Sequence, residues 1–456
     1  MSGAVFSAEE AAEWTGGSWR GVDSATRIDG VFTDSRKPAH GALYIAIRGE
    51  RFDGHDFVRS AVDGGACAVM ANASVRIPDD IPALIVEDTE AALTELAAGW
   101  RAKVDPEVVG VTGSVGKTTV KELTAHLLGA AGMTAKTLGN WNNSLGLPQS
   151  MLAMEEGTRF GVFEIGMNHP GELAPLVRLM QPDCAVVTNV GPVHIEFFAD
   201  EAAIADEKAE LLRAVPENGF AVLDADSPHF AYLARQARCR VVTVSLAAES
   251  DFKAEDYEAG GGRFMVREAA TGVGRVVDCG LPGAHQVVNA LEAIAVARQF
   301  GIGWDEIAER FQTAPRAKMR WEKTERDGVV WINDAYNANP VSMAKSVETF
   351  ARMDIPGRKV AVLGDMFELG SEEETLHRRV GGIVAASGLD FLITVGVRAR
   401  WIADSAEKAG MDLSEIFVAA DVPEAKRLLG KIIRAGDGVL IKASRGMALE
   451  AIMRSV

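Results

Sequence analysis

The stretch Gly110-Val-Thr-Gly-Ser-Val-Gly-Lys-Thr-Thr119 decides the fold of this chain. It follows the apolar run 108–111 and opens a segment in which Val120, Leu123 and Leu127 share one helical face. Glycines in such a turn let backbone N–H groups surround phosphate oxygens, and the N-terminus of the following helix favours their negative charge. The stretch therefore predicts a phosphate-binding loop between a strand and a helix.

The residues of this loop are suited to a nucleoside triphosphate. Lys117 is placed to reach the β- and γ-phosphates, and Thr118 is placed to bind Mg²⁺. The strict pattern has a glycine where this chain has Val111, so the loop is a variant, and a glycine-rich turn that only joins strand to helix is the alternative. The candidate ATP-binding residues of the loop are Gly113, Ser114, Val115, Gly116, Lys117, Thr118 and Thr119.

The chain extends far enough on both sides of the loop for about three domains. Apolar strands alternate with helices from residue 107 onward, which predicts mostly parallel sheets covered by helices, and the last series has a Rossmann-like doubly wound pattern. The predicted domains are a small α/β domain at 1–103, a central ATP-binding domain at 104–313 and a Rossmann-like domain at 314–456. The predicted strands are 42–47, 66–70, 83–86, 108–111, 162–165, 185–190, 220–223, 241–245, 329–332, 360–363, 391–395, 416–418 and 439–441, and the predicted helices include 89–100, 117–128 and 287–300.

The composition is that of a globular protein in water. Of 456 residues, 48% are hydrophobic and 24% charged, and the net charge is −17, which excludes wholesale disorder and opposes general binding to nucleic acid or anionic membranes. The N-terminal residues carry glutamates where a secretory signal needs positive charge, and no run of about 18 apolar residues occurs. The four cysteines lie far apart without CxxC pairing. We expect a cytoplasmic protein with reduced thiols.

Three side chains outside the loop are candidates for metal binding or catalysis. Glu164 and His194 each follow a predicted strand, so a parallel sheet places both near the loop, where either can bind a metal. An exposed strand-end acid and a structural histidine are the alternative interpretations. Lys208 lies on an amphipathic segment, and its spacing alone favours a solvated, salt-bridged helix face.

Motifs along the whole chain resemble those of the Mur ligases. Asn333-Asp-Ala-Tyr-Asn-Ala-Asn-Pro340 and Gly364-Asp-Met-Phe-Glu-Leu-Gly370 resemble the branch that adds a dipeptide, and the Asp-Asn-Pro-Arg sequence typical of the sister ligase that adds the third amino acid does not occur. Further markers are Thr33-Asp-Ser-Arg36, Asp53-Gly-His55, Asn140-Trp-Asn-Asn143, Glu164-Ile-Gly166, Asn189 to Glu196, Lys208-Ala-Glu210 and Gly283-Ala-His285.

This resemblance implies a function and a set of partners. It implies an ATP-dependent amide ligase of peptidoglycan precursor synthesis that joins D-alanyl-D-alanine to UDP-N-acetylmuramoyl-tripeptide through an acyl phosphate. Nothing in the sequence demands more than a monomer, so we expect one. The N-terminal domain is then expected to hold the uridine nucleotide and the C-terminal domain to close over ATP. The alternatives are the sister ligase and a regulatory ATPase without ligase activity, which leaves the N- and C-terminal motifs unexplained.

The resemblance also implies roles for individual residues. It implies two Mg²⁺ ions bound by Thr118, Glu164, His194 and a carbamylated Lys208, since carbamylation turns the lysine into the oxygen-rich anion that Mg²⁺ prefers. Two departures from the family pattern are Val115, where many relatives have Asn, and Lys442-Ala-Ser-Arg445, where Lys-Gly-Ser is usual. The other implied sites are ATP contacts at Asn289, Arg320, Asp334 and Asn337, substrate contacts at Ser35, Arg36, Asn142 and Asn143, and a catalytic set of Lys117, His194, Lys208 and Arg320.

Overall fold

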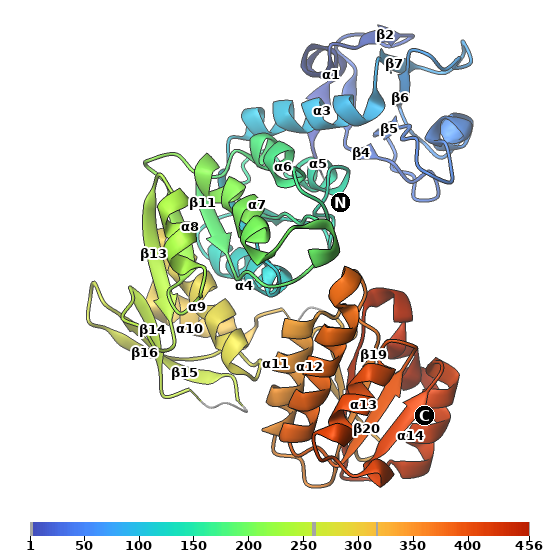
Figure 1. The fold of residues 1–456 in the computed structure, drawn as a ribbon. Helices are drawn as coiled ribbons and strands as arrows, with labels where there is room; N and C mark the ends of the chain where they lie inside the picture. Colours follow the sequence, from blue (N-terminus) through green and yellow to red (C-terminus); the bar gives the residue numbers. More distant parts are fainter. Residues whose placement is uncertain (1–2, 258–260, 316–317, 456) are drawn as a thin grey trace.

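The computed structural model describes residues 3–257, 261–315 and 318–455. Figure 1 shows three successive lobes, with the green and yellow central lobe between the blue N-terminal and the orange C-terminal one. Their main sheets have five, nine and six strands. The predicted three-part α/β fold is confirmed, and every predicted strand is present with ends that differ by a few residues.

The N-terminal lobe is a small sheet with strand order β2-β7-β6-β5-β4, beside a two-stranded β1-β3 sheet. Its last helix, α3, packs against the central lobe: Trp100 Nε1 donates to Met154 O (3.1 Å) and Arg101 Nη2 to Gln181 O (3.0 Å). The elements are β1 (Val5–Ser7), α1 (Ala8–Thr15), β2 (Ser18–Arg20), β3 (Arg27–Asp29), β4 (Val31–Phe32), β5 (Leu43–Ile45), α2 (Val58–Asp63), β6 (Ala68–Asn72), β7 (Ala83–Val86) and α3 (Thr89–Val104).

The central sheet has the order β16-β15-β14-β13-β12-β11-β8-β10-β9, and its strands from β9 to β14 are parallel. The strand before the phosphate loop, β8, lies between β10 and β11, where the chain changes direction across the sheet and ligands of such folds bind. The elements are β8 (Glu107–Thr112), α4 (Lys117–Leu128), β9 (Thr134–Lys136), α5 (Gly146–Met151), β10 (Phe160–Glu164), α6 (Leu173–Met180), β11 (Cys184–Val187), α7 (Glu201–Ala214), β12 (Phe220–Asp224), α8 (Phe230–Gln236), β13 (Arg240–Ser245), β14 (Phe252–Glu255), β15 (Arg263–Glu268), β16 (Gly274–Asp278), α9 (Ala284–Gln299) and α10 (Trp304–Gln312).

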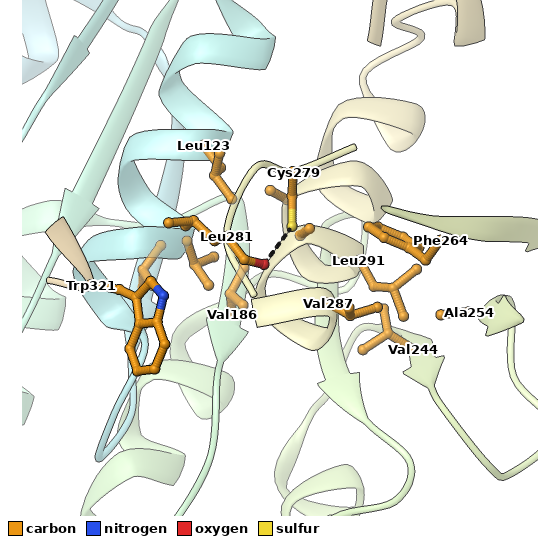
Figure 2. Packing of buried hydrophobic residues seen from close by; sticks show 14 of the residues in the cluster. Leu123, Val186, Val244, Ala254, Phe264, Cys279, Leu281, Val287, Leu291 and Trp321 are labelled. Carbon is orange, nitrogen blue, oxygen red and sulfur yellow. Dashed lines mark hydrogen bonds between the residues drawn. The ribbon is translucent and has the colours of Figure 1, made fainter. Parts of the chain in front are cut away.

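The core of this lobe forms around α9, which is buried on nearly all sides. Figure 2 shows Val287 and Leu291 of α9 beside Phe264 of β15 and Ala254 of β14, the two strands at which the sheet changes from parallel to antiparallel pairing. Trp321, at the entry to the C-terminal lobe, joins the same cluster. This packing fixes the first turns of α9 next to the phosphate loop.

The C-terminal lobe has the strand order β17-β18-β22-β19-β20-β21, parallel except for the edge strand β17. Helix α11 begins with a capping box in which Asn339 Oδ1 accepts from the Ser342 N–H, followed by Pro340 at its first position. The elements are β17 (Glu322–Arg326), β18 (Val329–Asn333), α11 (Pro340–Ala351), β19 (Lys359–Gly364), α12 (Glu373–Ala386), β20 (Phe391–Val395), α13 (Arg400–Lys408), β21 (Ile416–Ala419), α14 (Val422–Ile432) and β22 (Gly438–Lys442).

The cysteines and the helices agree with two expectations from the sequence, which were reduced thiols and no long apolar segment. Cys184, Cys239 and Cys279 are buried, Cys67 is partly buried, and all four are free thiols. Burial raises the pKa of the Cys67, Cys184 and Cys239 thiols. Within the described ranges, the helices are too short or too polar to cross a membrane.

Candidate active site

A cavity of about 410 Å³ lies between the phosphate loop and the C-terminal lobe. Its central-lobe wall combines the loop, the end of β10 and the first turns of α9, and its C-terminal wall comes from the segments after residue 319 and around α11. The predicted site residues in this wall are Ser114, Val115, Gly116, Lys117, Thr119, Asn142, Asn143, Glu164, His194, Asn289, Arg320, Asp334 and Asn337.

Two glycines give the loop its shape. Gly113 and Gly116 have φ values of 149° and 92°, which side chains disfavour. A Cβ on Gly116 would lie 2.5 Å from Asn289 Oδ1, and one on Gly113 would lie 2.0 Å from Thr188 Oγ1. The loop therefore needs glycine at both positions, and Asn289 lies directly against it.

The middle of the loop is held by the segment after β11. Asn189 Oδ1 accepts from the Val115 N–H (2.9 Å), and its Nδ2 donates to Val115 O (2.7 Å). Thr188 Oγ1 also donates to Val115 O, and the Gly191 N–H donates to Ser114 Oγ (2.9 Å). Because these contacts use only the backbone of Val115, its side chain can differ from the Asn of relatives without changing them.

Asn189→Ala is expected to lower kcat/KM for ATP about 30-fold, because it removes two hydrogen bonds to Val115 that are worth about 1 kcal/mol each. Asn189→Asp retains the acceptor and loses the donor, so its effect should be intermediate. Steady-state kinetics with varied MgATP measures both. Unchanged kcat/KM in the alanine variant would contradict this role.

Lys117 begins helix α4 and lies in the cavity, where its Nζ donates to Gly113 O (2.6 Å). Burial lowers the pKa of Lys117, the Glu164 carboxylate opposes this effect, and Arg320 adds to it. Two cationic groups therefore converge on a cavity in a protein of net charge −17, which suits a polyanionic ligand.

Glu164 and Thr118 lie together beneath the loop. Thr118 Oγ1 donates to Glu164 Oε2 and Asn142 Nδ2 to Glu164 Oε1, both at 2.9 Å. Glu164 is 2% exposed, so the interpretation as an exposed strand-end acid is wrong. A buried hydroxyl next to a carboxylate fits Mg²⁺, which commonly takes one or two protein oxygens and completes its shell with phosphate and water. The described residues contain no ready cluster of three histidine, cysteine or acidic side chains.

His194 lies in the same cavity wall as Glu164, whereas Lys208 is outside that wall and lies near His194 and Lys117. His194 Nδ1 is 2.5 Å from Glu368 Oε2 of the C-terminal lobe, and burial lowers the pKa of His194. Lys208 is 4% exposed on the inner face of α7, and burial, with the charge of Lys117, lowers its pKa well below the ordinary value. The spacing favoured a solvated, salt-bridged position for Lys208, and this prediction is wrong because the side chain is buried. The ion pairs on the outer face of α7 are instead those of Arg213 with Asp206 and Glu210.

The C-terminal wall is built from a strand end and its neighbours. The Arg320 guanidinium carbon lies 4.2 Å from the centroid of the Tyr336 ring. Asp334 is held by Lys442, whose Nζ lies 2.5 Å from Asp334 Oδ2, and by Ser346 Oγ at 2.6 Å. Lys442 Nζ also donates to Asn337 O (3.2 Å). The segment 442–445, which departs from the family pattern, therefore still contributes a lysine that connects Asp334 and Asn337.

The predicted substrate residues divide into two groups. Asn142 and Asn143 line the cavity, although the Asn143 side chain accepts from the Gly146 N–H at the start of α5 (2.8 Å). Ser35 and Arg36 lie in the N-terminal lobe and do not belong to the wall of this cavity. Arg36 is largely exposed and pairs with Asp34 (2.8 Å).

Three models of Mur ligase domains match consecutive parts of the chain: the Mur ligase family catalytic domain at 27–101, the Mur ligase middle domain at 111–297 and the Mur ligase glutamate ligase domain at 319–445. The UDP-N-acetylmuramoyl-tripeptide–D-alanyl-D-alanine ligase of Bacillus subtilis strain 168 is 36% identical over 435 residues, which cover 94% of this chain and 93% of that protein. The chain belongs to the Mur ligase family. The ligase of the same description from Escherichia coli K12 is also 36% identical, with 96% of each chain covered.

Solved Mur ligase structures resemble the whole chain. MurF from Acinetobacter baumannii is similar with a TM-score of 0.89 at 28% identity, and 99% of each chain is covered. The MurF ligase from Thermotoga maritima in complex with ADP is similar with a TM-score of 0.79 at 30% identity, covering 93% of this chain and 96% of that one. The three-lobed arrangement is thus a Mur ligase fold throughout.

Several residues that lie at this site were not predicted individually from the sequence. His285 was quoted only as part of a marker, yet it lines the cavity, and burial lowers its pKa to about 3. Asn189 was likewise only part of a marker, and Tyr336 part of another. Their place in such motifs was the available signal, because the contacts join segments far apart in sequence.

Proposed function

We propose that this Mur ligase joins D-alanyl-D-alanine to UDP-N-acetylmuramoyl-tripeptide in cytoplasmic peptidoglycan precursor synthesis, with cleavage of ATP. One observation carries the proposal: a single cavity combines a phosphate loop, Glu164, which accepts a hydrogen bond from Thr118 behind the wall, and Arg320 from the C-terminal lobe. ATP use is a property of the family, and the Thermotoga relative was solved with ADP. The names of the relatives in Bacillus and Escherichia supply the two substrates.

The residues suit a reaction through an acyl phosphate. The C-terminal carboxylate of the tripeptide attacks the γ-phosphorus of ATP, which forms the acyl phosphate and releases ADP. The dipeptide amine then attacks the acyl carbon, phosphate leaves, and the nitrogen gives up a proton as the amide forms. Charge repulsion opposes the first step, because a carboxylate meets a triphosphate. Lys117 and Arg320 offset that repulsion, because both line the cavity in which the phosphates are proposed to lie. The C-terminal lobe excludes water that would hydrolyse the acyl phosphate.

The donor set fits magnesium. Thr118, Glu164 and His194 would hold it, and bound Mg²⁺ would neutralise charge on the phosphates. Lys208 is proposed to carry a carbamate that completes this set. A buried amine of lowered pKa supports that assignment, because carbamylation requires an uncharged nitrogen and replaces a buried cation with oxygen ligands.

The remaining assignments belong to the same proposal. Residues 1–103 hold the uridine nucleotide through Ser35 and Arg36, residues 104–313 bind ATP, and residues 314–456 close over it. The hydrogen bond from Thr33 Oγ1 to Gln149 Oε1 (3.0 Å) brings the Ser35 loop next to the central lobe, as a substrate spanning both lobes requires. The enzyme is proposed to act as a monomer.

Phosphate release from MgATP tests the function. The nucleotide tripeptide and D-alanyl-D-alanine are supplied separately and together, and the product is identified by mass. We expect release only with both substrates and a pentapeptide product. Release with the nucleotide dipeptide and a single amino acid would instead identify the sister ligase. Phosphate release that is the same with and without these substrates would identify a regulatory ATPase.

A further inference from the structure

The residues on either side of Arg320 have left-handed backbone conformations. Met319 has a φ of 56° and Trp321 a φ of 55°. At such a φ the Cβ crowds a backbone carbonyl, so the conformation is uncommon for methionine and an outlier for a residue as bulky as tryptophan. Strained backbone of this kind persists only where the surrounding structure holds it, and it gathers at functional sites. Arg320 lies between the two outliers and lines the cavity beside the phosphate loop, the proposed nucleotide cavity.

The backbone of both outliers is held by the C-terminal lobe. Met319 O accepts from the Tyr336 N–H, and the Met319 N–H donates to Glu322 Oε2, both at 3.1 Å. The Trp321 N–H donates to Asp334 Oδ1, also at 3.1 Å. The three partners lie at the start of β17 or just after β18. The backbone at residues 319 and 321 is therefore fixed to one lobe.

The side chain of Trp321 connects that backbone to the central lobe. Trp321 is 4% exposed, and its indole belongs to the buried cluster that includes Leu123 of α4 and Val287 of α9 (Figure 2). The same cluster continues into the C-terminal lobe through Ile332. A tryptophan buries a larger apolar area than most side chains, so its burial can offset the cost of the left-handed backbone. Trp321 thus joins the two lobes at the residue next to Arg320.

Arg320 takes its direction from this arrangement. Its guanidinium carbon lies 4.2 Å from the centroid of the Tyr336 ring, a distance typical of a cation–π contact. Both residues line the cavity. The ring orients the guanidinium, but only a backbone fixed relative to the central lobe keeps it opposite the phosphate loop. Trp321 supplies that link, because its indole joins the lobes directly after Arg320.

We propose that Trp321 is a positioning residue for phosphoryl transfer: its anchored indole and the left-handed backbone at residues 319 and 321 place the Arg320 guanidinium opposite the phosphate loop. This inference rests on the proposed function, in which Arg320 offsets charge on the phosphates. A displacement of about 1 Å in a group that acts on the transition state can cost a factor of about 10². Loss of the anchor should therefore lower kcat, and it should do so through Arg320.

The backbone strain is tested without an activity assay. Met319→Ala and Met319→Gly both remove the side chain and differ only in the Cβ. At an ordinary position the glycine variant is the less stable of the two, because glycine loses more freedom on folding. At a φ of 56° the order should be reversed, so Met319→Gly should melt at a higher temperature than Met319→Ala. The ordinary order in thermal unfolding would overturn the strained backbone and with it the proposal.

The positioning role is tested by combining variants. Trp321→Ala should lower kcat for phosphate release with all substrates about 30-fold, and Arg320→Ala about 100-fold, because the latter removes the charged donor outright. If Trp321 acts through Arg320, the double variant should be as slow as Arg320→Ala within about twofold. Trp321→Leu keeps an apolar side chain in the cluster and should be intermediate. It takes the place of Trp321→Ala in the same comparison if the alanine variant does not fold.

Trp304 provides the matched control. It is 8% exposed on α10, in the same cluster but outside the cavity wall, so Trp304→Ala should lower the melting temperature and leave kcat within about twofold. Equal losses of kcat on Trp321→Ala with and without Arg320 would overturn the positioning role. A rise in KM for ATP alone would also overturn it and assign the indole to the nucleotide. A wild-type rate in Arg320→Ala would overturn the role proposed for Arg320 and this inference together, whereas failure of the inference alone leaves Arg320→Ala slow.

Discussion

Lys117→Ala is expected to lower phosphate release about 10³-fold with all substrates present. The ammonium of Lys117 lies inside the nucleotide cavity beside the loop carbonyl of Gly113, where it can follow the charge that develops on the transferred phosphoryl group. Removing one such preorganised donor commonly costs a factor of about 10²–10³, and a full positive charge places Lys117 at the upper end. Single-turnover phosphate release measures the effect directly.

The same variant should not lose thermal stability. Burial lowers the pKa of Lys117 in the folded protein, so its protonation opposes folding, and this cost shrinks as the pH rises through the lowered pKa toward the ordinary lysine value of 10.5. Deleting the amine removes that cost. The exposed Lys323→Ala serves as the matched control and should retain activity. Wild-type turnover in Lys117→Ala would contradict the role of this residue.

Lys208→Ala is expected to lower ligation at least about 100-fold, because it deletes the proposed carbamate and with it a magnesium ligand. Short carboxylates such as acetate should restore part of the activity, since they can supply the missing oxygens in the space that the side chain leaves. Ligation is measured as pentapeptide formed at increasing carboxylate concentration. The intact mass of the wild-type protein under bicarbonate should show the added carboxyl group.

A neighbour on the same helix provides the control. Arg213 lies on the outer face of α7, paired with Asp206 and Glu210, so Arg213→Ala should keep nearly full ligase activity and gain nothing from carboxylates. Full activity of Lys208→Ala would show that the buried amine serves packing only. Loss of activity without any carboxylate rescue would argue for the amine itself rather than a carbamate.

Continuous patterns allowed most of the fold to be predicted. The parallel strands are short apolar runs between helices, and α4 begins and ends where its apolar spacing indicates. The strands β14, β15 and β16 were not predicted, because charged residues interrupt β14 and bound β15, and β16 is largely exposed, so none forms a long apolar run. Their partner is the buried helix α9, and such tertiary packing leaves no local signal.

The candidate site was predictable where one segment contains the chemistry. The phosphate loop is such a segment, and Lys117 and Thr118 lie where its pattern placed them. Lys208 is the opposite case, because its neighbours Asp206 and Glu210 suggest a solvated face although the lysine points inward. Helical spacing tells which residues share a face but not which face meets the core, so only the resemblance distinguished Lys208.

The sheltered thiols have a practical consequence for following lobe motion. Thiolates react with maleimides, whereas the thiols of Cys184, Cys239 and Cys279 are buried, and Cys67 is partly covered with a raised pKa. The protein with only its native cysteines will therefore react little with a maleimide dye. A cysteine introduced at Val397, 83% exposed on the C-terminal lobe, can then carry a single fluorophore, and a second at Phe52, 73% exposed on the N-terminal lobe, its energy-transfer partner. The distance between the dyes then measures the proposed movement of the C-terminal lobe during turnover. The native cysteines need not be replaced first.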